Sequence, residues 1–219
     1  MNNTMIQLLV LAGIAVFLVL KLRSVLGTRE GFEKPPIPPT TERSAAGPNL
    51  TVVETGPDRD ILDHAPEGSA SALALAAMKQ AEPAFSLTTF LQGARGAYEM
   101  ILMAFERGDL SQVRPFLGPE VAETFAEAIA AREAQGLTVE ANFVGLREMS
   151  FVEAEFNPAT REGEVTVRFG GELTSVIRNK AGEVVEGSAT EIKRQRDVWT
   201  FARKMGSSDP NWQLVATGE

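Results

Sequence analysis

A run of apolar residues near the N-terminus constrains this chain more than any other feature of its sequence. Between Met5 and Leu22 only Gln7 and Lys21 are polar, and both lie near an end of the run. A helix over these 18 residues would rise about 27 Å, close to the roughly 30 Å hydrocarbon thickness of a bilayer. The segment therefore predicts a transmembrane helix at residues 5–22.

The residues that flank this run distinguish an anchor from a cleaved signal peptide. A signal peptide carries basic residues before its apolar run and small residues at a cleavage site after it. Here Lys21 and Arg23 come at the end of the run, and Arg29 and Lys34 follow. Because positive residues stay on the cytoplasmic side, we expect an uncleaved single-pass anchor, with the N-terminus outside and the rest of the chain in the cytoplasm.

Residues 27–68 predict a disordered linker, since seven of the 12 prolines lie there and no apolar period is sustained. The only histidine, His64, lies near Asp58, Asp60 and Asp63. Their spacing does not match a calcium loop, so we interpret them as a solvated acidic patch and expect no metal site. The predicted division is an anchor at 5–22, a linker at 27–68, a short connecting helix at 69–83 and a folded domain at 84–219.

The folded domain begins with a helical pattern. Ser86 is suited to cap a helix whose apolar residues recur for about five turns, and Gly108 ends it. Pro119 opens a further helix that Gly136 closes. Tyr98 falls on the apolar stripe of the first of these helices, where we expect a packed aromatic side chain rather than a hydrogen-bond donor.

After Gly136 the apolar period changes to two, and polar residues such as Glu172 alternate with apolar ones, as on a sheet with one solvated face. Gly145, Gly170 and Gly171 are positions where bends or bulges are tolerated. Helices followed by strands predict an α+β fold, with helices packed on one face of a curved, four-stranded antiparallel sheet. The predicted strands are 139–156, 163–178, 184–204 and 212–217.

Charge and composition exclude several functions. The formal net charge is -8, and residues 84–219 carry 14 basic against 20 acidic side chains, so phosphate backbones would repel the domain and we expect no nucleic-acid partner. The chain has no cysteine and the domain no histidine, while Glu153 and Glu155 share a strand face that we expect to meet solvent. We therefore predict no catalytic residues and no cofactor.

Two groups of side chains are candidates for binding. A basic cluster in the acidic domain either protects a strand edge or contacts a lipid headgroup or protein partner. It consists of Lys193, Arg194 and Arg196. Aromatic residues on adjacent predicted strands either fill the core or line an apolar pocket. They are Phe169, Trp199, Phe201 and Trp212.

The segments FLQGARGAYEMILMAFERGDLSQVRPFLGPEVAETF and DVWTFARKMGSSDPNWQLVAT resemble the Tim44-like family. This family comprises the C-terminal domain of the mitochondrial inner-membrane import adaptor and its bacterial relatives. The similarity covers Ala84 to Thr217. It implies a cone like that of nuclear transport factor two, in which helices cover a curved sheet and enclose an apolar pocket that contacts membrane lipid.

The resemblance also implies a function. It suggests a non-catalytic adaptor or scaffold, tethered to the bacterial inner membrane, that assists membrane protein complexes or translocation. Membrane lipid and other membrane or chaperone proteins are the implied partners. Where the mitochondrial relative has a transit peptide and a long charged region, this chain has an apolar segment and a proline-rich linker, a layout that the bacterial relatives share. A lipid or small-ligand binding module is the alternative, and an enzyme is a further one because cone folds also host ketosteroid isomerase.

Overall fold

The computed structural model describes residues 58–218. The predicted anchor, its flanking Lys21 and Arg23, and residues 27–57 of the predicted linker lie outside the described residues. Within residues 58–218, no helix combines the length and apolarity needed to cross a membrane.

Helices come first and strands follow, which confirms the predicted α+β class. Every predicted strand boundary lies within one residue of the observed one. The helices are α2 (Arg59–Leu62), α3 (Ala70–Ala81), α4 (Leu87–Arg107), the short 3-10 helix η1 (Arg114–Phe116) and α5 (Pro119–Ala134). The strands are β1 (Thr138–Asn157), β2 (Glu162–Arg178), β3 (Val184–Lys204) and β4 (Gln213–Gly218).

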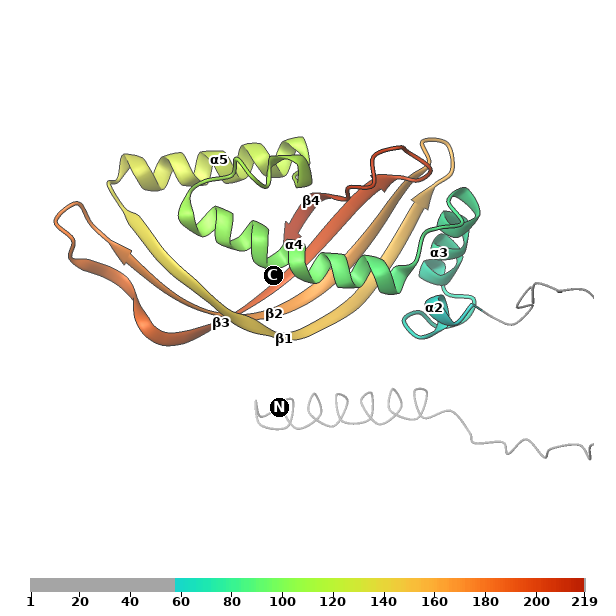
Figure 1. The fold of residues 1–219 in the computed structure, drawn as a ribbon, viewed down its shortest axis with the longest axis horizontal. Coiled ribbons are helices and arrows are strands. Elements are labelled where there is room, and N and C mark those ends of the chain that lie inside the picture. Colours follow the sequence, from blue (N-terminus) through green and yellow to red (C-terminus); the bar gives the residue numbers. More distant parts are fainter. Residues whose placement is uncertain (1–57, 219) are drawn as a thin grey trace, which may run out of the picture. The chain divides into compact units, whose positions relative to one another are not determined.

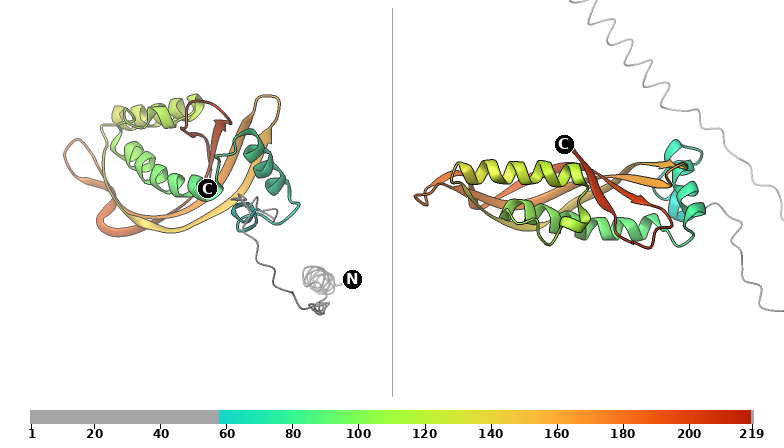
Figure 2. Two further views of the ribbon diagram at one scale, coloured as in Figure 1. Left: turned by 45° about the vertical axis from the view of Figure 1, so that its right-hand side comes forward. Right: turned by 90° about the horizontal axis from the view of Figure 1, so that it is seen from above.

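The four strands form one antiparallel sheet in the order β1-β2-β3-β4. Figure 1 shows this sheet as a curved cradle, with α4 and α5 on its concave side. The views in Figure 2 place α3 at one end of the cradle, beside the hairpin that joins β1 to β2. The helices therefore form a layer that covers one face of the sheet.

The curvature has a local cause in β1. Its pairing with β2 shifts register at three places, the first between Phe143 and Gly145. The second shift lies opposite Gly170 and Gly171, where the sequence predicted a bend. A β-carbon on Gly171 would lie 2.7 Å from the hydroxyl oxygen of Tyr98, so this glycine also gives a buried side chain of α4 room to approach the sheet.

The core forms where α4 crosses the concave face. The ring of Tyr98 stacks on Phe169 with centroids 4.5 Å apart, and Trp199 lies 4.8 Å from the same ring. Tyr98 and Phe169 are fully buried, and Trp199 is 3% exposed. The serine cap and terminal glycine predicted for α4 are both present, because Ser86 accepts a hydrogen bond from the Thr89 N–H and Gly108 has a φ of 77°.

The end of the predicted linker is folded, which corrects the predicted boundary at residue 68. At the start of α4, Asp60 accepts hydrogen bonds from the backbone N–H groups of Leu87 and Thr88, both at 2.8 Å. Lys79 of α3 pairs with Asp58 at 2.7 Å and with Asp60 at 2.8 Å. Two of the three acidic residues that the sequence suggested were a solvated patch, Asp58 and Asp60, therefore link α2, α3 and α4, whereas Asp63 is exposed.

This arrangement predicts that residues 58–219 fold without the part of the chain before them. They contain the caps, the core and the sheet, and a domain of this size buries about two-thirds of the surface of its unfolded chain. A fragment that begins at Ser69 lacks Asp60 and should lose about 2 kcal/mol or more of unfolding free energy. Urea unfolding of both fragments measures this difference, and equal midpoints would show that residues 58–68 do not stabilise the domain.

Candidate apolar pocket

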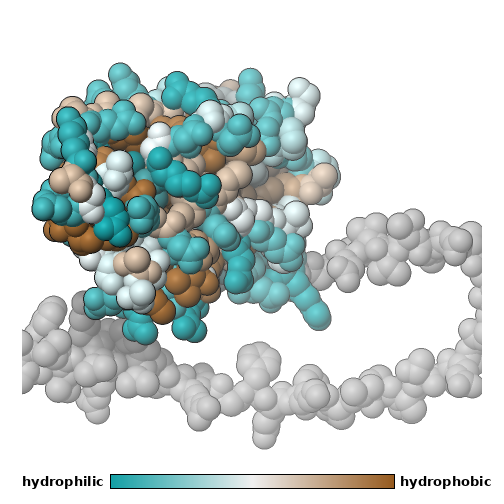
Figure 3. Space-filling model, turned by 60° about the vertical axis from the view of Figure 1, so that its left-hand side comes forward, coloured by the Kyte–Doolittle hydropathy of each residue, from teal (hydrophilic) through white to brown (hydrophobic). Residues whose placement is uncertain are grey.

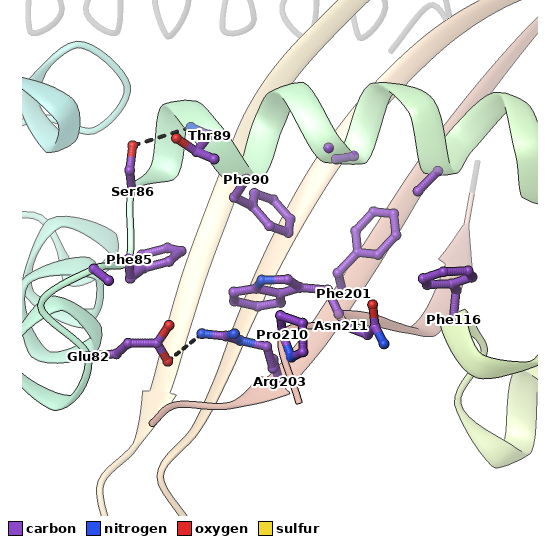
Figure 4. A pocket seen from close by; sticks show the side chains of 15 residues that line it. Glu82, Phe85, Ser86, Thr89, Phe90, Phe116, Phe201, Arg203, Pro210 and Asn211 are labelled. Atoms are coloured by element: carbon purple, nitrogen blue, oxygen red, sulfur yellow. Dashed lines mark hydrogen bonds and ion pairs between the residues drawn. The ribbon is translucent and has the colours of Figure 1, made fainter. Parts of the chain in front are cut away.

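A cavity of about 340 Å³ lies between the first half of α4, the end of β3 and the loop that joins β3 to β4. Figure 4 shows its side chains converging from these elements and from η1. The rings of Phe90 and Trp212 pack against each other at an interplanar angle of 60°, with 4.6 Å between centroids, so the wall is continuous there. Its aromatic lining consists of Phe85, Phe90, Phe116, Phe201 and Trp212.

Beyond Phe90, the wall that α4 contributes is made of small residues. Gly93, Ala94 and Ala97 line the cavity from this helix. A β-carbon on Gly93 would meet no atom within 4 Å, so packing does not require glycine there. Glycine inside a helix costs about 1 kcal/mol relative to alanine. The missing side chain at Gly93 therefore keeps the cavity open beside α4, at a cost to helix stability.

One end of the cavity is polar. The carboxylate of Glu82 forms an ion pair with Arg203 and accepts a hydrogen bond from the Gly206 N–H at 2.7 Å. The pKa of Glu82 is lowered, because the hydrogen bond from Arg203 is the largest influence on it and outweighs the opposing effect of partial burial. The guanidinium carbon of Arg203 lies 5.5 Å from the centroid of the Trp212 ring, within the range of a cation–π contact.

The four aromatic residues predicted for the pocket fall into two places. Phe201 and Trp212 line the cavity, whereas Phe169 and Trp199 are absent from its lining and pack in the core around Tyr98. Phe85, Phe90 and Phe116 belong to the wall although the sequence did not indicate them. In the sequence Phe85 and Phe90 stand on either side of Ser86, the cap of α4, and only this spacing could have singled them out.

Tyr98 is a hydrogen-bond donor as well as a packed ring, which corrects the prediction. Its hydroxyl donates to Asp197 at 2.6 Å, and Asp197 also accepts from the Gln195 amide at 3.0 Å. Burial first, and then the bond to Asp197, raise the pKa of Tyr98 far above its ordinary value. The hydroxyl therefore stays protonated and ties α4 to β3.

The basic cluster is also divided by the structure. Arg194 lies 3.3 Å from the carboxylate of Glu172, and Arg147 of β1 lies 2.8 Å from it. Glu172 is only 3% exposed, so its predicted place on a solvated face is wrong. Hydrogen bonding from Arg147, with a further contribution from Arg194, lowers its pKa. Lys193 and Arg196 are exposed.

The hairpin formed by β2 and β3, which carries this basic cluster, also exposes aliphatic side chains. Figure 3, turned so that this end of the molecule comes forward, shows apolar patches among a mainly hydrophilic surface. Val184, Val185 and Ile192 are each more than half exposed. Exposed aliphatic residues are common on soluble domains, so these three carry no functional assignment.

Acidic residues elsewhere do not form a metal centre in the part of the chain that the structure describes. Glu153 and Glu155 are exposed, as predicted. Glu155 pairs directly with Glu164 across β1 and β2. Burial, followed by repulsion from Glu162 and Glu155, raises the pKa of Glu164.

Comparison with known proteins places the chain in a family. The family model described as "Tim44-like domain" matches residues 71–219, which include the whole cavity lining. The human mitochondrial import inner membrane translocase subunit TIM44 is 26% identical over 138 residues, a match that covers 61% of this chain and 30% of the human protein. This chain thus matches less than a third of that protein's length. A crystal structure of the intermembrane space region of chloroplast protein ARC6 aligns with 58% of this chain and 94% of its own, at 11% identity and a TM-score of 0.40. Because the family model covers more than half of its length, the chain belongs to the Tim44-like family.

Proposed function

We propose that this chain is a non-catalytic adaptor, tethered to the bacterial inner membrane by residues 5–22, whose apolar pocket holds lipid or an apolar part of a protein partner. One observation carries the proposal. The aromatic-walled cavity is kept open at Gly93, which has no side chain, although the helix would be more stable with a larger residue there. Such a cavity is of the size and character that suits a small apolar ligand.

The family supplies the biological setting of the proposal. The human relative is named as a subunit of an inner-membrane import translocase, which supports a role beside a membrane and in protein translocation. The apolar run between Met5 and Leu22 supplies the tether, and Lys21 and Arg23 would anchor it at the cytoplasmic boundary. The partners are membrane lipid and membrane or chaperone proteins.

Three titratable groups have shifted pKa values, and their contacts support an adaptor rather than an enzyme. Asp60 caps α4, Glu172 lies between two arginines, and Tyr98 joins α4 to Asp197. Each of these groups has a structural partner that accounts for its pKa. Outside the cavity, the exposed Lys193 and Arg196 are proposed to contact a lipid headgroup or a partner.

The tether predicts the topology of the whole chain. Alkaline phosphatase fused after Glu219 should be inactive in a bacterial host, because that enzyme requires export and the basic residues all follow the apolar run. A cytoplasmic reporter at the same position should be active. An active phosphatase fusion, or an N-terminus cleaved near Leu26, would contradict the anchor.

Filling the pocket from α4 separates binding from folding. Gly93→Leu should leave the domain at least as stable, since leucine is favoured over glycine in a helix by about 1 kcal/mol and its β-carbon would meet no atom within 4 Å. It should reduce the lipid or protein recovered with the chain from membranes by roughly tenfold, which corresponds to about 1.4 kcal/mol of binding free energy.

Gly96→Leu is the matched control for this experiment. Gly96 lies one turn further along α4, its β-carbon would also meet nothing within 4 Å, and it is not part of the cavity lining. Recovery should stay normal with this variant. If both variants lower recovery equally, or neither does, the pocket is not the binding site.

A further inference from the structure

The convex face of the sheet carries a hollow that is surrounded by arginine side chains. Figure 1 places α4 and α5 on the concave side, where Gly171 of β2 lies against Tyr98. Because side chains alternate between the two faces of a strand, Arg168, Gly170 and Glu172 of β2 face the convex side. A hollow of about 450 Å³ lies over Gly170, and residues of β1 and β3 line it from either side.

A buried carboxylate holds two of these arginines. Glu172 accepts hydrogen bonds from Nε of Arg147 at 2.8 Å and from Nε of Arg194 at 3.3 Å. Glu172 is 3% exposed, whereas the side chains of Arg147 and Arg194 are 74% and 85% exposed. Within residues 58–218, neither arginine donates a hydrogen bond to protein through its Nη atoms. Glu172 therefore orients two guanidinium groups whose remaining N–H groups are open to solvent.

The hollow has an excess of positive charge. Arg196 pairs with Gly170 across β2 and β3, and Arg168 lies two residues before Gly170 on the same face. Both arginines are exposed and have no ion-pair partner among residues 58–218. Besides Glu172, the lining has one carboxylate, that of Glu148, which pairs with Gly170 across β1 and β2. Four guanidinium groups and two carboxylates leave a net charge of +2, although the domain as a whole is acidic.

Gly170 forms the floor of the hollow because it has no side chain. A β-carbon at this position would lie 3.2 Å from the β-carbon of Glu148, so a larger residue would crowd β1 as well as fill the space. Glycine weakens the interior of a strand, and it occurs where a strand bends or where a ligand approaches the backbone closely. At Gly170 the bend of the sheet thus coincides with an open surface between guanidinium groups.

Charge and hydrogen-bond donors together fit a phosphate monoester. Such a group carries about -1.5 to -2 charges at pH 7 and has three strong acceptor oxygens, which suit several guanidinium groups at once. A carboxylate brings one charge and two oxygens, and Glu172 already supplies one here. The hollow is larger than a phosphate group alone. Glu148 at its rim offers an acceptor to hydroxyl groups on the body that carries the phosphate.

From these observations we infer that the convex hollow binds a hydroxylated phosphate monoester, with Arg147, Arg194 and Arg196 around the phosphate and Glu172 as the residue that positions the first two. The phosphate belongs to a soluble molecule or to the head of a bilayer lipid, two sources with the same chemistry. This site lies on the opposite face of the sheet from the apolar pocket. It goes beyond the proposed function, which assigned only Arg196 of these residues.

Equilibrium dialysis with radiolabelled glycerol 3-phosphate tests the site. The full-length protein is held in phosphatidylcholine discs, and saturable binding at one site per chain is expected. Arg168→Gln combined with Arg196→Gln should weaken binding roughly tenfold or more, because two charged groups beside the phosphate are lost. Neither residue has an ion-pair partner in the described part of the chain, so the melting temperature should not change.

Arg95→Gln combined with Lys193→Gln is the matched control, because it removes the same number of positive charges from exposed positions. Arg95 lies on α4, and Lys193 precedes Arg194 on β3, so its side chain faces the concave side. At about 0.15 M salt general attraction between charges is screened, and binding should change by less than about twofold.

The composition of the discs distinguishes the two sources of phosphate. Phosphatidic acid has a phosphate monoester as its head, so it should compete with the label if a bilayer lipid occupies the site. Phosphatidylglycerol has a phosphodiester head, and discs with equal surface charge made from it control for simple repulsion of the label.

Each outcome decides the inference. Binding that the Arg168 and Arg196 double variant weakens and the control variant retains supports it. Competition by phosphatidic acid beyond that of phosphatidylglycerol then identifies the bilayer as the source, and its absence identifies a soluble molecule. A lack of saturable binding, or equal weakening by both double variants, overturns the inference. Neither result bears on the apolar pocket, which Gly93→Leu tests separately.

Discussion

Trp199→Ala should destabilise the domain by about 3 to 5 kcal/mol, enough to unfold much of a domain whose total stability is of the order of 5 to 15 kcal/mol. The indole is 3% exposed and touches Tyr98, Phe169 and Phe201 within the core. Its removal leaves a cavity among the neighbouring aromatic rings, and packed rings relax only partly into such a space. Chemical unfolding monitored by circular dichroism measures the loss.

Trp212→Ala is the matched comparison, because it removes the same side chain from the pocket wall. Trp212 is partly exposed and contacts Phe85 and Phe90 from the edge of the core. Its loss should cost clearly less stability, while lowering the recovery of the bound lipid or partner. Equal destabilisation by the two changes would show that Trp212 belongs to the core and that the distinction between core and pocket is wrong.

Asp60→Ala should cost about 2 to 4 kcal/mol, a large effect for a residue in a segment that the sequence assigned to a linker. The change removes the acceptor of three hydrogen bonds at the start of α4 and a partner of Lys79. Asp63→Ala, which alters a neighbouring exposed carboxylate, is the control and should change stability by less than about 0.5 kcal/mol. A similar small loss for both would contradict the proposed role of Asp60.

The Asp60 contribution should depend on pH in a defined direction. Partial burial works against ionisation, but the hydrogen bonds from Lys79, Thr88 and Leu87 prevail and hold the pKa of Asp60 well below its ordinary value of 3.8. A lowered folded-state pKa contributes stability that is complete above the unfolded value and is lost as pH falls below it. The difference between the unmodified chain and Asp60→Ala should therefore be constant near neutrality and shrink below about pH 4.

The secondary structure was largely predictable because local patterns determine it. Alternation between apolar and polar residues defined β2, and Ser86 and Gly108 defined the ends of α4. The exceptions depend on contacts between residues far apart in the sequence. Asp60 was predicted in a linker because its partners lie at the start of α4, and Glu172 was predicted in solvent because Arg147 and Arg194 come from neighbouring strands.

The candidate site was predictable only in part for the same reason. Strand alternation showed that Trp199 and Phe201 share a face, but it could not show that both are buried and that only the second borders the cavity. Gly93 looked like any glycine inside a helix, and its significance comes from the empty space beside it. The sequence did not single out Arg203 as a site residue, because its place at the polar end of the cavity depends on an ion pair with Glu82, which lies far away in the sequence.

A photocrosslinking amino acid placed at Asn211, in the cavity lining, tests most directly whether the pocket is occupied in the cell. Crosslinking in intact bacteria should attach lipid or a membrane protein at this position, Gly93→Leu should reduce the adduct, and the same probe at the exposed Ala181 in the distant β2–β3 turn should not form it. No adduct at Asn211, or an adduct that Gly93→Leu leaves unchanged, would contradict an adaptor that works through this pocket.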